Sequence, residues 1–284
     1  MARNRLITIL AILLLLAAPP VFAQPDITWV TVEGFAAAGQ GSKEEARSRA
    51  LEDALRKARE KVIGSSVSVE ALAVNFKLSG GLVAAIPYLN IVEKTIVEEG
   101  MTAAEGGVSA TRYRVLVKAG IAEVIEGVDP AFKVESSLNR SAFTEGDEMK
   151  IQIKATQDCD VSVFLITGEG KVIRLLPNRF KSVLFLKGGE VFTFPSEEDR
   201  RVGLKLITNL DDNKTAQEAI YVLALKNPGT YDPSRFKEGL YGVYDGNTAF
   251  LNELAKDISG IPLQGRAEKL IQYQINRKDK GGMR

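Results

Sequence analysis

The chain contains no histidine and a single cysteine, Cys159, and these two scarcities narrow the chemistry available to it. Without histidine there can be no Ser-His-Asp or Cys-His nucleophile system, no histidine-ligated zinc and no histidine proton shuttle. One cysteine excludes an internal disulfide and a cysteine metal cluster. Cys159 lies in an apolar strand pattern, so we expect a buried, inert thiol rather than a reactive one.

The chain also lacks a strong excess of either charge, because 37 Lys and Arg residues stand against 36 Asp and Glu residues. This balance gives no sign of a nucleic-acid partner. Beyond the first residues, no apolar run approaches the roughly 18 residues that a membrane-spanning helix needs. We therefore expect no transmembrane span in the mature protein.

Residues 1–23 are typical of a cleavable signal peptide. Arg3 and Arg5 give a basic start, a short apolar run follows, and small residues precede a predicted cut between Ala23 and Gln24. Because no cysteine follows this cut, a lipoprotein anchor is not expected. The sequence therefore predicts a periplasmic or secreted protein.

Residues 42–64 predict one long amphipathic helix. Ser42 and Glu45 can form a capping box, and Gly64 fits the position just after the last turn. One face consists mostly of alanine, which lets a helix backbone lie close to its neighbour, and the other face is expected to be a solvated surface. That second face offers three acid–base pairs four residues apart, Glu45–Arg49, Glu52–Arg56 and Asp53–Lys57.

Strands predicted at 27–35, 90–99 and 109–121 surround this helix. In the last of them apolar residues alternate with Arg112, Arg114 and Lys118, which predicts a sheet with one apolar and one basic face. Arg112 and Arg114 are candidates for an anion-binding surface, although we favour the simpler interpretation that they keep the strand soluble. Together these elements predict an α+β domain over residues 25–125, with the helix covering the sheet.

Three motifs of this region resemble a known family. They are Val30 to Gly34, the alanine-rich helix from Ala46 to Ala58, and Tyr113-Arg-Val115-Leu-Val117. With them the region resembles the N-terminal domain of flagellar assembly protein T and the related LPP lipoprotein domain of bacterial envelopes. The resemblance implies an export-competent, non-catalytic envelope domain. The chain departs from the lipoproteins in lacking a lipobox cysteine.

Residues 126–132 form a predicted linker, and short strands separated by turns follow it. This pattern of short strands and turns predicts an antiparallel β-sandwich domain over residues 130–276, before a disordered tail at 277–284. Residues 130–226 also resemble the bacterial domain-of-unknown-function family 4384, which implies no activity. The markers are Arg140…Phe143-x-x-Gly146-Asp147, CDVSVFLIT, Gly170-Lys-Val…Leu176-Pro177-Asn178, Gly188-Gly189-Glu190 with Phe194-Pro195, and Glu218 to Ala224.

Several stretches invite a functional interpretation, and each has a plainer one. The acids at 197–199 and 211–212 with Asn213 could gather around calcium, but they lack the alternating ligands of a calcium loop, so we favour turns. Residues 168–171 are too short for a phosphate loop and predict a hairpin turn. The late aromatic residues could stack on sugars, but we favour a packed core. Those residues are Tyr221, Tyr231, Phe236, Tyr241, Tyr244, Phe250 and Tyr273.

These observations favour an exported, non-catalytic envelope protein that binds envelope proteins or cell-wall components. We expect no catalytic residue, no metal and no cofactor, and we name Tyr241, Tyr244, Arg112 and Arg114 as the candidate binding surface. A carbohydrate-binding or carboxylate-dependent hydrolase module is the first alternative. A flagellum-associated assembly component is the second, and it rests on resemblance alone.

Overall fold

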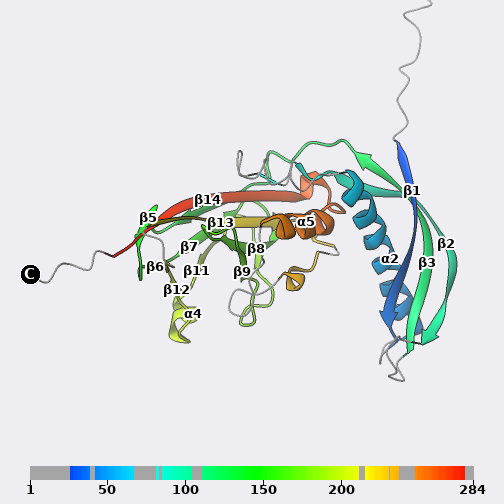
Figure 1. Cartoon of the computed structure of the whole chain (residues 1–284), viewed down its shortest axis with the longest axis horizontal. Coiled ribbons are helices and arrows are strands. Elements are labelled where there is room, and N and C mark those ends of the chain that lie inside the picture. Colours follow the sequence, from blue (N-terminus) through cyan, green and yellow to red (C-terminus); the bar gives the residue numbers. More distant parts are fainter. Residues whose placement is uncertain are drawn as a thin grey trace, which may run out of the picture.

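The structure, a computed structural model, describes residues 26–38, 42–66, 81–82, 85–103, 111–210, 215–229, 231–236 and 247–278. The predicted α+β class is confirmed, since a helix packed on a small sheet precedes a strand-rich unit (Figure 1). The predicted signal peptide and its cut lie outside the described residues. No helix within these ranges is both long and apolar enough to cross a membrane.

The N-terminal unit is a three-stranded antiparallel sheet with a helix on one face (Figure 1). Its strands stand in the order β1-β3-β2, and β3 is paired on both sides. Every second residue of β3 from Tyr113 to Ile121 is buried beneath the helix, as the alternation predicts. The elements are β1 (Ile27–Ala37), α2 (Lys43–Ser66), β2 (Tyr88–Ala103) and β3 (Thr111–Val124).

Small residues allow α2 to lie close against β1. A Cβ atom at Gly34 would stand 1.9 Å from the Ala50 carbonyl oxygen and 2.5 Å from the Ala54 amide nitrogen, so only glycine fits there. Ala46, Ala50, Ala54 and Ala58 are all buried on the same face of the helix. The first two motifs, the Val-x-x-x-Gly strand β1 and the alanine-rich helix α2, thus pack directly against each other.

The predicted capping box of α2 is present. The Glu45 amide donates to Ser42 Oγ at 3.2 Å, and the Ser42 amide donates to Glu45 Oε2 at 3.1 Å. The predicted end of the helix was wrong, because α2 continues past Gly64 to Ser66. Its exposed face keeps the predicted Asp53–Lys57 ion pair at 2.7 Å.

Arg56 uses other partners than the predicted Glu52. It pairs with Asp53 and Glu60, one turn away on either side. Residues three and four apart both face each other on a helix, so spacing alone does not choose between these acids.

The second unit is built from short strands that form two packed sheets and a small ribbon. The larger sheet has the order β10-β8-β13-β14-β5, with β9 also paired to β8. The smaller sheet has the order β11-β7-β4, and β12 pairs with β6. All of these pairs are antiparallel except β14–β5, which is parallel. Apolar residues from both sheets form one core between them, as a sandwich requires.

The second unit consists mainly of short strands. The elements are β4 (Val134–Leu138), β5 (Ala142–Thr144), β6 (Glu148–Met149), β7 (Ile151–Ala155), β8 (Cys159–Ile166), β9 (Val172–Leu176), β10 (Phe185–Leu186), β11 (Val191–Phe194), α4 (Glu197–Arg201), β12 (Leu206–Ile207), β13 (Thr215–Leu225), η2 (Pro233–Arg235), α5 (Asn247–Ile258), η3 (Leu263–Gly265) and β14 (Arg266–Asn276). The last strand, β14, lies within the larger sheet between β13 and β5.

A second core joins the two units. It runs from the alanine face of α2 through α5 to the outer face of β8 and β13. The ring of Phe164 lies 4.9 Å from that of Phe250 and 5.5 Å from that of Phe236. The preference for a packed core is confirmed for five of the late aromatic residues, which are buried: Tyr221, Tyr231, Phe236, Phe250 and Tyr273.

Polar side chains of β14 hold the chain segment that precedes β2. Arg266 is only 1% exposed, and its guanidinium donates to the carbonyl oxygens of Ile261 and Ile86, each at 2.7 Å. Glu268 accepts from the Leu82 amide at 2.8 Å and from the Tyr221 hydroxyl at 2.8 Å. We call these contacts of Arg266 and Glu268 the β14 junction.

We expect Arg266→Met to destabilise the protein by about 2–5 kcal/mol, because it leaves buried carbonyl oxygens without a donor. The measurement is the free energy of unfolding in urea, and Lys269→Met is the matched control because Lys269 is exposed on the same strand. A variant as stable as the parent would show that the junction is dispensable.

A buried carboxyl group lies where α5 approaches α2. Asp257 on α5 pairs with Arg235 at 2.5 Å, and Arg235 also lies 3.7 Å from Glu60 of α2. Burial outweighs the nearby Arg235 and raises the pKa of Asp257 to about 7. Glu60 and Glu253 act in the same direction as burial, while Arg56 opposes it.

The raised pKa of Asp257 predicts that stability falls as the pH rises from about 4 to about 7. In this window the unfolded chain has lost the Asp257 proton while the folded protein still holds it, so deprotonation favours unfolding. Asp257→Asn should remove this part of the slope, and its stability relative to the parent should improve as the pH rises. Urea unfolding at several pH values measures both. Parallel pH profiles of parent and variant would contradict the assignment.

Candidate functional site

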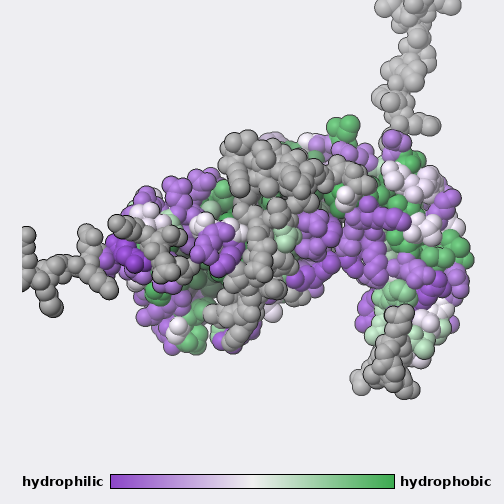
Figure 2. Space-filling model, viewed as in Figure 1, coloured by the Kyte–Doolittle hydropathy of each residue, from purple (hydrophilic) through white to green (hydrophobic). Residues whose placement is uncertain are grey.

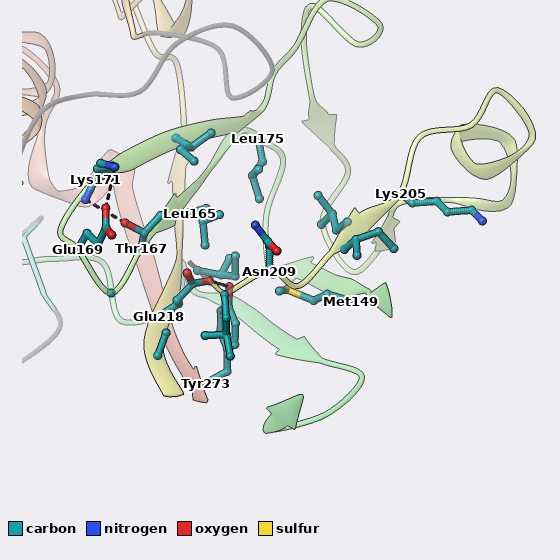
Figure 3. Close-up of a pocket in the computed structure, with 17 residues that line it drawn as sticks. Met149, Leu165, Thr167, Glu169, Lys171, Leu175, Lys205, Asn209, Glu218 and Tyr273 are labelled. Carbon is teal, nitrogen blue, oxygen red and sulfur yellow. Dashed lines mark hydrogen bonds and ion pairs between the residues drawn. The ribbon is translucent and has the colours of Figure 1, made fainter. Parts of the chain in front are cut away.

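The β-sandwich is open at one end and leaves a cleft of about 430 Å³ (Figure 3). One wall comes from β8, β9, β13 and β14, and the other comes from the β6–β12 ribbon and the segment after it. Leu165, Ile173 and Leu175 form the apolar part of the first wall, and Met149 and Leu206 face them from the second. We call this space the sandwich cleft; it continues the apolar core between the two sheets.

A carboxylate and a phenol meet in the sandwich cleft. Glu218 of β13 and Tyr273 of β14 stand directly opposite each other in the antiparallel pair, and the Tyr273 hydroxyl donates to Glu218 Oε2 at 2.6 Å (Figure 3). Burial, the charge of Glu218 and their hydrogen bond all raise the pKa of Tyr273. The phenol therefore stays protonated and acts as a hydrogen-bond donor.

The rim of the cleft is polar. The β8–β9 turn brings Thr167, Glu169 and Lys171 to one side, where Lys171 pairs with Glu169 at 2.7 Å (Figure 3). Lys205 and Asn209 lie on the other side. The turn is the predicted hairpin, because the Thr167 amide donates to the Lys171 carbonyl at 2.9 Å. It does not have the strand-to-helix geometry of a phosphate loop.

This arrangement suits binding. Apolar walls can take up an apolar group, while a polar rim orients whatever enters, and such a division is common in ligand sites. Because its raised pKa keeps the Tyr273 phenol protonated near neutral pH, Tyr273 donates a hydrogen bond to Glu218 and does not readily release its proton.

The two predicted arginines lie on the outer face of the N-terminal sheet and not in the cleft. Arg114 pairs with Glu33 of β1 and, at 3.2 Å, with Glu98 of β2. Arg112 stacks on the Phe35 ring with its guanidinium carbon 4.1 Å from the ring centre. Both side chains are engaged within the sheet, which supports the plainer interpretation that they serve the strand itself.

The other predicted binding residues, Tyr241 and Tyr244, lie outside the described residues, as do the acids at 211–212 and Asn213. Asp199 belongs to the capping box of α4, with its carboxylate accepting from the Ser196 amide at 2.9 Å. Among the residues that the structure describes, no three His, Cys, Asp or Glu side chains are gathered as a metal site requires.

Cys159 is buried at the start of β8, as predicted. Burial, with smaller effects of Asp160 and Asp158, raises the pKa of its thiol to about 11. The thiolate is therefore scarce at neutral pH, and an inert thiol follows.

The pairing of Glu218 with Tyr273 was not predicted, although one signal was available. Along β13 the residues facing the sandwich core are Ala216, Glu218, Ile220, Val222 and Ala224. A single acid in such an apolar series marks a position where a carboxylate needs a partner. Its partner on β14 depends on the strand register, which the sequence does not specify.

We expect Tyr273→Phe to lower the free energy of unfolding by about 1.5–3 kcal/mol, because it removes a hydrogen bond to a carboxylate. Tyr231→Phe is the comparison, since it removes a 2.9 Å hydrogen bond between two neutral groups, the Tyr231 and Ser162 hydroxyls. That loss should be smaller, about 0.5–1.5 kcal/mol. Urea unfolding of both variants tests the ranking, and the reverse order would contradict an ionised Glu218.

Comparison with known proteins supports the second of the two resemblances. No curated protein matches this chain. Among solved structures it is similar to the sporulation control protein Spo0M from Bacillus subtilis, with 12% identity over 51% of this chain and 49% of that one, and a TM-score of 0.25. So low a score carries no argument about fold or function. Residues 142–228 match the family described as a domain of unknown function (DUF4384), close to the predicted 130–226.

Proposed function

We propose that this protein is exported to the bacterial cell envelope and acts there, without catalysis, by holding a partner protein in the sandwich cleft. The observation that carries the proposal is the cleft itself: about 430 Å³ of open space with apolar walls and a polar rim. The basic start and apolar run of residues 1–23 support export.

The chemistry of the cleft favours an apolar side chain on an extended peptide as its occupant. Ile173 and Leu175 on β9 offer the apolar wall, and both are only partly buried. Charges of both signs stand on the rim, at Lys205 and Glu169, so the site has no strong preference for a charged ligand.

The carbohydrate-binding alternative loses much of its support. Five of the seven aromatic residues that suggested it are buried in the two cores, where their rings cannot stack on a sugar. The flagellar alternative rests on the N-terminal resemblance. The tight contact of Gly34 with Ala50 gives a physical reason for two of its motifs, but a helix packed closely on a strand serves many functions.

Photo-cross-linking in living cells tests the proposal. A photo-reactive amino acid at Ile173, in the full-length protein, should give a cross-linked product of defined mass with an envelope protein. The same amino acid at Lys154, which is exposed on β7 outside the cleft, is the control and should give none.

Three other results would change or overturn parts of the proposal. Cross-links that disappear after muramidase digestion would replace the protein partner by the cell wall. A mature protein that retains residues 1–23 and stays in the cytosol would overturn export. Turnover of any substrate that depends on Glu218 would overturn the non-catalytic role.

A further inference from the structure

The backbone groups on the outer edge of β1 have hydrogen-bond partners along one part of the strand and, among the described residues, lack them along the other part. The Ala38 amide donates to the Thr111 carbonyl of β3 at 3.0 Å, so the even-numbered residues of β1 direct their backbone groups toward β3. The odd-numbered residues therefore direct theirs away from the sheet. At this outer edge the Phe35 amide donates to Asp53 Oδ2 at 3.0 Å, and the Glu33 carbonyl accepts from Lys57 at 3.2 Å.

Helix α2 thus takes the place of a neighbouring strand beside Glu33 and Phe35. The covering ends there. β1 pairs only with β3, and within the described part of the chain the outward backbone groups of Ile27, Trp29 and Thr31 have no partner. An uncovered edge of this kind is a template for another strand.

The opposite edge of the same sheet is protected in two other ways. β2 is irregular between Ile91 and Glu93 and again between Ile96 and Glu98, and such bulges disturb pairing. It also carries several charges, which oppose the approach of another strand. In contrast, β1 keeps an unbroken register with β3 from Ile27 to Ala37 and has no charged residue from Ile27 to Val32.

The open stretch also carries exposed apolar surface. Trp29 is 44% exposed and Ile27 is 39% exposed, and both lie against Gly120 on the outer face of the sheet. Lys118 stands 5.0 Å from the centre of the Trp29 ring. Figure 2 shows hydrophobic residues among hydrophilic ones over this sheet, at the right of the view.

We propose that the open half of β1 binds the same stretch of a second copy of this chain, as an antiparallel strand pair around a two-fold axis at Trp29. In this register Trp29 faces Trp29 of the copy, and Ile27 faces its Thr31, so that each uncovered residue meets an uncovered one. No like charges face each other. The pairing stops by itself, because Asp53 and Lys57 already occupy the edge beside Phe35 and Glu33.

The chain contains one tryptophan, so its fluorescence reports on this contact directly. The protein expressed from its full sequence should show a monomer–dimer equilibrium in analytical ultracentrifugation. Its emission maximum should shift to shorter wavelength over the same concentration range, because pairing removes Trp29 from water. A short strand pair gives a small interface, so the series must extend to several hundred micromolar.

Thr31→Pro is the decisive variant. It removes only an outward amide, which a prolyl residue on an edge strand tolerates, so the fold should persist while the dimer and the fluorescence shift are lost. Val30→Pro is the matched control, because it removes an amide directed at β3 and should destabilise the sheet itself. The register is tested by mixing Ile27→Cys and Thr31→Cys proteins, which should form a disulfide together more readily than either does alone.

A protein that stays monomeric at several hundred micromolar, with a constant emission maximum, would overturn the proposal. So would a dimer that survives Thr31→Pro, since its contact must lie elsewhere. Cross-linking of Ile27→Cys protein to itself in preference to the mixture would replace the antiparallel register by a parallel one and would equally refute the two-fold pairing.

Discussion

The β14 junction is the constraint on which the arrangement of the two units depends. Arg266 and Glu268 bond to the backbone at Leu82 and Ile86, next to the start of β2, and thereby fix a segment of the first unit to a strand of the second. Buried backbone groups need partners, and here side chains far away in the sequence provide them. The apolar core that runs from α2 to β13 lies beside this junction, so the units share both polar and apolar contacts.

The need of backbone groups for hydrogen-bond partners also explains why part of the outer edge of β1 is covered. Because Gly34 lets α2 approach closely, Asp53 and Lys57 reach the backbone of Phe35 and Glu33 and complete its hydrogen bonds. Tight packing of small residues therefore has a second effect, which is to cover part of an edge that would otherwise attract strands. Where the covering ends, the edge is free to pair.

Two surfaces with different chemistry thus lie on different units. The sandwich cleft has apolar walls around the Glu218–Tyr273 pair and suits a side chain of a partner. The open half of β1 offers backbone groups and the exposed ring of Trp29, and it suits a strand. A protein that pairs with itself through one surface and holds a partner through the other would present two clefts at once, which raises avidity without any new contact.

The sequence by itself determined the features that a local pattern decides: the capping box at Ser42, the alanine face of α2, and the alternation of Tyr113 to Ile121 are all found as predicted. It also indicated the buried state of Cys159 and of most late aromatic residues. Contacts between distant residues were decided only by the tertiary structure. Arg56 forms ion pairs with Asp53 and Glu60. Arg114 forms ion pairs with Glu33 and Glu98. Tyr273 donates a hydrogen bond to Glu218. Each of these contacts depends on strand register or on the placement of a helix. Both are set when the whole chain packs, and the spacing of residues along the sequence does not reveal them.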